Sequence, residues 1–225
     1  MATPAAGKAI DELALDDLRL ALAPGIARAA AFDGWSEAAV AAAAEEAGVA
    51  PAAAAFAFDD GAMGMIAAWI GHVDAAMAQA FPEGALAGLP VRERIRRLVS
   101  FRLDAIAGRE EALRRALAIM AMPQNAARAL RLGWESADAM WRLAGDTATD
   151  YNHYTKRAML AGIYAATLAV FADDTSDGKA ATRAFLDRRI EGIIRFEKAK
   201  AKWSPPEEAR FSLSRFLGRL RYPAR

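Results

Sequence analysis

Few side chains in this sequence are of the types that carry catalysis, and none is spaced for it. The two histidines are His72 and His153, and neither forms the Glu-x-x-His pair that a di-iron helical bundle must repeat. The carboxylate pairs Glu45-Glu46 and Asp173-Asp174 fall near expected helix ends, where solvated charge is the ordinary interpretation. The segment Gly61-Ala-Met-Gly64 is too short and too apolar to cradle a phosphate. The spacing of these residues therefore indicates no catalytic site.

Residue types that are missing exclude further chemistry. The chain has no cysteine, which rules out disulfides, thiolate metal ligands and cysteine nucleophiles. It has neither a Gly-x-Ser-x-Gly nucleophile elbow nor a P-loop, the motifs that position an activated serine or a nucleotide phosphate. We expect a protein that is not an enzyme and that uses no metal or other cofactor.

The composition indicates which elements position the remaining side chains. Apolar residues make up 55% of the 225 residues, and much of that share is alanine, whereas Val, Ile, Thr and Tyr are sparse. Alanine favours helix, and the scarcity of β-branched and aromatic residues disfavours strands. A chain of this length can bury a substantial core as one large domain or as a small domain fused to a larger one.

Glycine, proline and capping residues divide the chain into helices of ordinary length. No segment alternates as a strand does, and no glycine-spaced hairpin is present. The sequence therefore predicts an all-α fold. About ten helices are expected, over residues 11–32, 36–48, 51–58, 61–81, 90–108, 109–122, 123–143, 150–171, 176–202 and 206–221.

The expected helix over residues 150–171 is apolar on opposite sides. One stripe at helical spacing consists of Tyr151, Tyr154, Ala158, Ala161, Ala165 and Leu168. The opposite side carries Leu160, Ile163, Tyr164 and Phe171. A helix that is apolar all round is typical of a buried one. Its first turns differ, because His153 and its basic neighbours give that end a polar side. We expect the helix to run through a bundle core and to emerge at a polar rim.

The N-terminal region resembles the helix-turn-helix domain of the tetracycline-repressor superfamily. A long helix precedes Gly34-Trp35-Ser36, and Ala47-Gly48-Val49 forms a turn into a short third helix. Such a domain needs cations to neutralise DNA phosphates, yet no Lys or Arg occurs from Ala29 to Val91. The third helix, residues 51–58, contains only Pro, Ala and Phe, none of which reads a base edge by hydrogen bonding. The sequence predicts the repressor architecture without nucleic-acid binding.

The C-terminal region has the opposite charge. Residues 209–225 contain five arginines and no acidic residue. The pattern is typical of a basic amphipathic helix that lies in a membrane interface, and Pro205-Pro206 makes the segment separable from the bundle. The alternative is a terminal helix docked on its own bundle. The predicted membrane-binding residues are Arg210, Leu213, Arg215, Phe216, Leu217, Arg219, Leu220 and Arg221.

Four stretches give the chain a family resemblance. They are Gly34-Trp35-Ser36, Ala121-Met-Pro-Gln-Asn125, Asp138-Ala-Met-Trp-Arg-Leu-Ala-Gly-Asp146 and the sixteen residues from Thr149 to Tyr164. On these stretches the sequence resembles the ubiquinone-biosynthesis accessory family, the ninth coenzyme-Q accessory protein of mitochondria and its bacterial counterparts. The resemblance covers roughly Leu18 to Lys202.

The resemblance implies a function as well as a fold. It implies a repressor-like bundle that has lost DNA binding, holds a lipid in a cavity and carries a C-terminal membrane helix. It implies that the protein presents polyprenylated quinone precursors to the di-iron hydroxylase that acts on demethoxyubiquinone. It also associates one segment with contact to that partner, here Met140, Trp141, Tyr151, His153 and Tyr154.

An isoprenoid or phospholipid ligand would need a hollow lined by excess apolar side chains. Methionine and aromatic residues at helical spacing are equally consistent with ordinary core packing, and that alternative stays open for each candidate. The candidate lining residues are Met65, Trp69, Phe101, Leu117, Met120, Leu160 and Tyr164.

These features predict three regions: a helix-turn-helix-like module over residues 1–60, a lipid-binding bundle over 61–203 and an amphipathic tail over 204–225. Repressor-like bundles pair through their last two long helices, so we expect a homodimer. The first residues lack a signal or transit pattern, and no apolar stretch of about 18 residues is uninterrupted. We expect a bacterial cytoplasmic protein, peripheral to the inner membrane.

Two alternatives belong to other functional classes. The first is a ligand-sensing transcriptional regulator of the tetracycline-repressor family, against which the acidic, alanine-rich N-terminal module argues. The second is an enzyme that holds a small molecule in a helical bundle, against which the missing catalytic residues argue.

Overall fold

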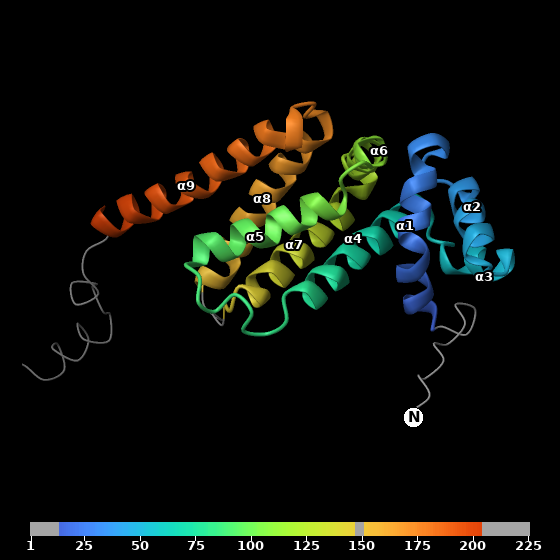
Figure 1. The fold of residues 1–225 in the computed structure, drawn as a ribbon, viewed down its shortest axis with the longest axis horizontal. Coiled ribbons are helices and arrows are strands. Elements are labelled where there is room, and N and C mark those ends of the chain that lie inside the picture. The colour runs from blue at the N-terminus through green and yellow to red at the C-terminus, as the bar shows by residue number, and fades with distance from the viewer. Residues whose placement is uncertain (1–13, 147–150, 204–225) are drawn as a thin grey trace, which may run out of the picture. The chain divides into compact units, whose positions relative to one another are not determined.

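The structure, a computed structural model, describes residues 14–146 and 151–203. Within these ranges, the backbone alone is described for residues 151–152 and 193–203. Every regular element in the described part is a helix (Figure 1), so the predicted all-α fold is confirmed there. The elements are α1 (Leu15–Asp33), α2 (Glu37–Ala47), α3 (Pro51–Ala57), α4 (Gly61–Ala80), α5 (Val91–Ala105), α6 (Glu110–Met120), η2 (Pro123–Asn125), α7 (Ala126–Leu143), α8 (Tyr151–Asp173), η3 (Asp177–Lys179) and α9 (Ala180–Trp203).

The chain divides into two compact units, Met1–Asp187 and Arg188–Arg225. The first unit contains α1 to α8 and the first two turns of α9. The residues predicted to bind a membrane, from Arg210 to Arg221, lie outside the described residues.

Capping residues set the predicted turn between α2 and α3. The Ser36 hydroxyl accepts a hydrogen bond from the Ala39 amide at 3.5 Å and so caps the start of α2. Gly48 ends α2 with a φ of 68°, a left-handed conformation that glycine adopts without steric strain. Pro51 then occupies the first turn of α3, where a missing amide hydrogen costs no helical bond. The predicted turn at Ala47-Gly48-Val49 is confirmed.

Two tryptophans attach the N-terminal helices to the bundle. The indole nitrogen of Trp35 donates to the Ala112 carbonyl of α6 at 3.0 Å. The Trp35 ring also packs against the ring of Trp69 on α4, with centroids 5.4 Å apart. Because both tryptophans are buried, α1 to α3 share a continuous core with α4 and α6.

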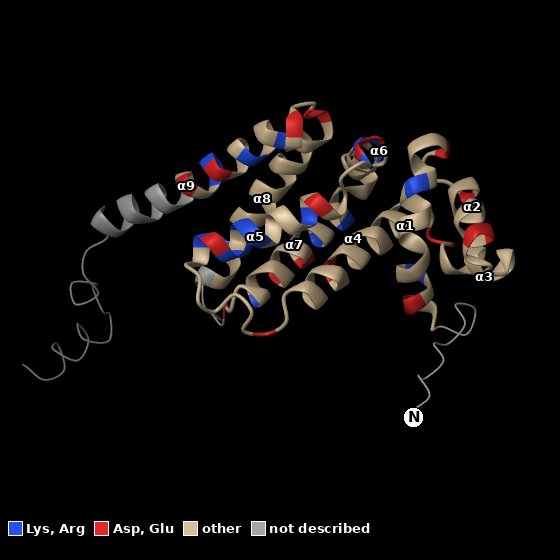
Figure 2. Cartoon of the chain, viewed as in Figure 1, with Lys and Arg blue, Asp and Glu red and all other residues tan. Residues whose placement is uncertain are grey.

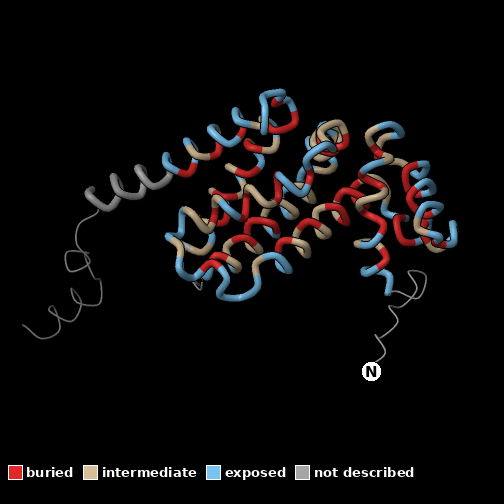
Figure 3. Tube along the Cα trace, viewed as in Figure 1, coloured by how far each residue is buried: buried red, intermediate tan, exposed pale blue. Residues whose placement is uncertain are grey.

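The bundle is formed by α4 to α8. Helix α7 packs along α8, and α5 contacts α4, α7 and α8. Their inward faces carry the buried residues (Figure 3), among them Ile66, Leu98, Val99 and Met140. Burial of such side chains is the main favourable term in the stability of the fold.

The prediction that α8 is buried all round is wrong. Leu160, Tyr164 and Phe171 are buried, whereas the opposite stripe that includes Tyr154 and Ala158 is exposed. Farther along the predicted stripe, Ala165 is exposed and Ala161 and Leu168 are half-buried, and the neighbouring Gly162 and Ala169 are exposed as well. Alanine and glycine count as apolar in a periodicity argument, but each contributes little area to a core. An exposed face made of them therefore costs far less free energy than one made of leucine.

No described helix is by itself both long enough and apolar enough to cross a membrane. The pair α3 and α4 meets the length and composition criteria together, although the two helices are bent by 89°.

Candidate partner-binding site

The candidate site lies where α7 ends and α8 begins. Leu143 is the last residue of α7, and Gly145 follows with a φ of 81°. A Cβ atom at this glycine would strain the backbone and would lie 3.1 Å from Nη1 of Arg94. Because α7 packs along α8, the reversal brings the last turns of α7 beside the first turns of α8.

A buried arginine fixes this reversal. The side chain of Arg157, on α8, is 2% exposed. Its Nε donates to Oδ1 of Asp138 on α7 at 2.5 Å, and its Nη1 donates to Oδ2 of Asp146 at 3.1 Å. Nη1 also donates to the His153 carbonyl at 3.2 Å. One guanidinium therefore ties α7, the segment after it and the first turn of α8 together.

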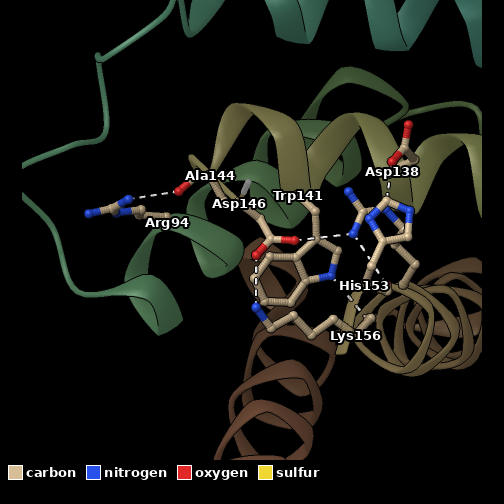
Figure 4. A network of polar contacts seen from close by, with 8 residues as sticks. Arg94, Asp138, Trp141, Ala144, Asp146, His153 and Lys156 are labelled. Carbon is tan, nitrogen blue, oxygen red and sulfur yellow. Dashed lines mark hydrogen bonds and ion pairs between the residues drawn. The ribbon is translucent and has the colours of Figure 1, made fainter. Parts of the chain in front are cut away.

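Two less buried cations complete the ion network. Nζ of Lys156 lies 2.7 Å from Oδ1 of Asp146 (Figure 4), and Nη2 of Arg142 lies 2.6 Å from Oδ2 of Asp138. Burial alone would raise the pKa of the Asp146 carboxyl, but the hydrogen bonds from Lys156 and Arg157 outweigh it and lower that pKa below its ordinary value. Asp146 is thus held ionised at neutral pH.

Trp141 links the same two helices through its polar atom. Its indole nitrogen donates to the Lys156 carbonyl at 3.1 Å, and Nζ of Lys156 lies 5.4 Å from the centroid of its ring (Figure 4). The indole is half-buried. Met140, the neighbouring candidate, has no exposed surface, so its side chain does not reach the surface that a partner would contact.

Beside the ion network, three rings form what we call the aromatic patch: Trp134, His153 and Tyr154. Tyr154 is 62% exposed. Its ring stacks on Trp134 with centroids 6.0 Å apart, and it contacts the edge of His153 with centroids 5.1 Å apart. Leu130, which is 76% exposed, lies one turn before Trp134 on the same face of α7. The patch is therefore aromatic and partly exposed, and it lies beside a buried, ion-paired network.

Sequence reasoning placed His153 and Tyr154 in the site but missed Trp134. The seven-residue spacing between Trp134 and Trp141 puts both on one side of α7 and was a usable signal. The side chain of the remaining candidate, Tyr151, lies outside the described part of the structure.

Sequence reasoning also missed Arg94, because no local pattern marks it. Its Nε, Nη1 and Nη2 donate to the carbonyls of Leu89, Ala144 and Ala87, each at 2.7 Å. Figure 4 shows the guanidinium directed at the Ala144 carbonyl. The side chain thus ties the segment between α4 and α5 to the carboxyl end of α7.

The candidate lipid-lining residues lie in the bundle but have different neighbours. Met65, Trp69, Leu160 and Tyr164 are buried, and Phe101, Leu117 and Met120 are half-buried. Trp69 packs on Trp35, Phe101 meets the edge of Phe81 at 5.6 Å between centroids, and Tyr164 lies under the Arg102 guanidinium at 4.8 Å. Across residues 14–146 and 151–203, no group of three His, Asp or Glu side chains could hold a metal ion.

Comparison with known proteins connects this site to a family. Residues 126–197, which include all of α7 and α8, match the COQ9 family model. The rat mitochondrial ubiquinone biosynthesis protein COQ9 is 46% identical over 80 residues, which are 36% of this chain and 26% of that protein. The human protein of the same name is 42% identical over 80 residues, 36% of this chain and 25% of the relative.

A more distant relative aligns over a longer stretch. A probable ubiquinone biosynthesis protein coq9 of Dictyostelium discoideum is 26% identical over 136 residues, 60% of this chain and 44% of its own length. In the rat and human comparisons, by contrast, the chain spans about a quarter of the length of the relative. The predicted resemblance to this family is confirmed, and the family model places it on the helices that carry the aromatic patch, over residues 126–197 of the predicted Leu18 to Lys202.

The fold has a counterpart among solved structures. A TetR transcriptional regulator from Nitrosomonas europaea superposes with a TM-score of 0.61, covering 77% of this chain and 96% of the regulator, at 22% sequence identity. At that identity the likeness concerns the fold alone, and it confirms the predicted repressor-like architecture.

Proposed function

We propose that this chain is a non-enzymatic, lipid-binding accessory protein of ubiquinone biosynthesis that presents polyprenylated quinone precursors to the di-iron demethoxyubiquinone hydroxylase. The observation that carries the proposal is the aromatic patch on its ion-paired base, because it lies within the segment that matches COQ9 proteins.

The chemistry of the aromatic patch suits a protein partner. Aromatic side chains with polar atoms dominate the binding energy of protein interfaces. Tyr154 and Trp134 offer such surface, and the buried Arg157 network holds their backbone in place before a partner arrives. Pre-organisation of this kind reduces the entropy lost on binding.

The remaining parts of the proposal concern lipid, membrane and assembly. The ligand is an isoprenoid or a phospholipid held among the apolar side chains of the bundle, and the basic C-terminal segment binds an inner-membrane surface. Two copies pair through their last two long helices. The exposed alanine and glycine face of α8 supports that pairing, because small residues let helices approach closely.

The alternative of a transcriptional regulator is disfavoured by the surface of α3. Its exposed residues are Pro51, Ala52, Ala55 and Phe56, which have no side-chain donor or acceptor for a base edge. Helix α2 carries acidic residues and no basic ones, and α3 carries no charged residue at all (Figure 2). Such a surface repels the phosphate backbone that supplies non-specific affinity.

The test is a pulldown of the hydroxylase with Tyr154→Lys. Loss of binding at an unchanged melting temperature supports a partner surface at the aromatic patch. Phe56→Lys is the matched control, because Phe56 is an aromatic residue on α3 that is 67% exposed. The Phe56→Lys protein should bind the hydroxylase as the wild type does. Unchanged binding by a folded Tyr154→Lys protein would place the interface elsewhere, and a collapsed melting temperature would assign Tyr154 to the stability of the fold instead of to a partner surface.

A further inference from the structure

A second charged cluster lies inside the bundle, away from the aromatic patch. Four helices contribute to it: Asp74 from α4, Arg102 from α5, Ser136 from α7 and Tyr164 from α8. Arg102 is 1% exposed, and Ser136 and Tyr164 are also buried. A fully buried arginine is unusual in a helical bundle, and its contacts show what it can bind.

Most of the polar atoms in this cluster satisfy one another. Nη1 of Arg102 pairs with Oδ1 of Asp74, and Nη2 donates to Oγ of Ser136 at 3.1 Å. The Ser136 hydroxyl donates in turn to Oδ2 of Asp74 at 3.3 Å. The guanidinium carbon lies 4.8 Å from the centroid of the Tyr164 ring, a distance at which a cation and an aromatic face attract each other.

One donor in the cluster has no acceptor. Nε of Arg102 is buried and makes no hydrogen bond, unlike every other buried side-chain nitrogen and oxygen in the described part of the chain. A buried donor without an acceptor destabilises a fold. A buried ion pair is also no more stabilising than well-packed apolar residues of the same volume. Packing therefore does not explain an arginine at this position.

The charge of the cluster defines the acceptor that would suit Nε. The Asp74 carboxylate already neutralises the Arg102 guanidinium. An anionic ligand would therefore be repelled by Asp74, and no unpaired positive charge in the cluster would offset that repulsion. A neutral carbonyl, ether or hydroxyl oxygen meets no such repulsion. The residues one turn away are apolar and fully buried: Leu98 on α5 and Met140 on α7. They would suit the carbon skeleton of the same molecule.

We infer that Asp74, Arg102, Ser136 and Tyr164 form the polar end of a ligand site in the bundle, where Nε of Arg102 donates to a neutral oxygen on the ring of a quinone or phenol. Leu160, one turn before Tyr164 and also buried, contacts the apolar part of that ligand. The inference rests on the proposed lipid binding and narrows it, because it favours a neutral ring over a phosphate head group.

The test compares three probes delivered in the same detergent micelles by isothermal titration calorimetry. They are a dimethoxy-methyl-benzoquinone with a decyl tail, decylbenzene and dodecyl phosphate. We expect the wild-type protein to bind the quinone roughly tenfold more tightly than decylbenzene, the effect of one hydrogen bond to a charged donor. Dodecyl phosphate should bind more weakly than the quinone.

The decisive variant is Arg102→Lys, which keeps the charge beside Asp74 and Tyr164 but has no Nε–H. Its affinity for the quinone should fall to that for decylbenzene, while its affinity for decylbenzene stays unchanged. Arg97→Lys is the matched control, because Arg97 lies on the same helix, is exposed and pairs only at 3.4 Å with Glu93. That variant should retain the full preference for the quinone.

The outcomes separate this inference from the function on which it rests. Binding of none of the probes by the wild type would overturn lipid binding and this inference together. Equal binding of quinone and decylbenzene, or an Arg102→Lys protein that keeps the preference, would overturn only the assignment of Arg102. Tighter binding of dodecyl phosphate than of the quinone would overturn the neutral head group. If Arg102→Lys fails to fold, the wild-type comparison of the three probes still decides.

Discussion

The indole nitrogen of Trp141 and the backbone carbonyl of Lys156 form a 3.1 Å hydrogen bond that joins the last turn of α7 to the second turn of α8. A helical carbonyl normally accepts from the amide four residues later, so this carbonyl serves a second donor. The bond positions the backbone from which the neighbouring Tyr154 projects, and Trp141 therefore has a structural role beneath the patch.

Replacing Trp141 by Phe tests that role. The ring is retained in part and the hydrogen bond is lost, so the free energy of unfolding should fall by about 1 kcal/mol from the bond alone, with a further loss from the smaller ring. Urea denaturation followed by circular dichroism measures the change. An unfolding free energy equal to that of the wild type would show that the bond contributes nothing.

Arg157 and Arg142 offer a matched pair of substitutions, because both contact Asp138. Arg157→Met leaves two carboxylates without their buried cation and should destabilise the fold by about 3–5 kcal/mol. The side chain of Arg142 is 75% exposed. Arg142→Met should therefore lower the free energy of unfolding by only about 0–1 kcal/mol. Thermal melting of both variants checks the order, and equal effects would contradict the anchoring role of Arg157.

The lowered pKa of Asp146 predicts a dependence of stability on pH. Its pKa in the folded protein lies below its value in the unfolded chain, so its stabilising contribution is present above about pH 4 and is lost as pH falls through the folded pKa. Asp146→Asn should therefore be less stable than the wild type at pH 7. The difference between the two melting temperatures should shrink steadily below pH 4, and a constant difference would contradict the ionic role.

The basic C-terminal segment predicts a membrane affinity that can be removed. Deleting residues 206–225 should weaken binding to vesicles of anionic lipid, since each arginine near such a surface contributes about 1 kcal/mol, and should leave the melting temperature unchanged. Added salt should weaken binding of the full chain only in part, because the leucine and phenylalanine face inserts by the hydrophobic effect. Equal vesicle binding by both proteins would assign this segment to docking on its own fold.

The sequence predicted the helices well because local chemistry sets their ends. Gly48 and Pro51 marked the turn between α2 and α3, and Phe81-Pro82 marked the end of α4. The predicted burial of α8 was wrong because hydrophobic periodicity does not distinguish small apolar residues from large ones. Leu160 and Ala158 both count as apolar, yet only the first has enough area to require burial.

Pairs that join distant helices were beyond sequence reasoning. Asp74 and Arg102 are 28 residues apart, and Arg94 and Ala144 are 50 apart. Neither pair lies at a spacing that a helix or turn imposes. Their meeting depends on how α4, α5 and α7 pack, which is a property of the whole core. The aromatic patch was predicted in part because the family resemblance covers His153 and Tyr154, whereas Trp134 joins them only through the register of α7 against α8.

The three bonds of Arg94 restrict how this part of the chain can vary. Two of the carbonyls it binds, those of Ala87 and Leu89, belong to the segment before α5, and the third, that of Ala144, follows α7. An insertion between Phe81 and Pro90 would displace the first two acceptors and release the third. A homologue with a longer segment here should consequently lack this arginine and close the end of α7 by another donor. Segment length and residue type at position 94 should therefore change together among related sequences.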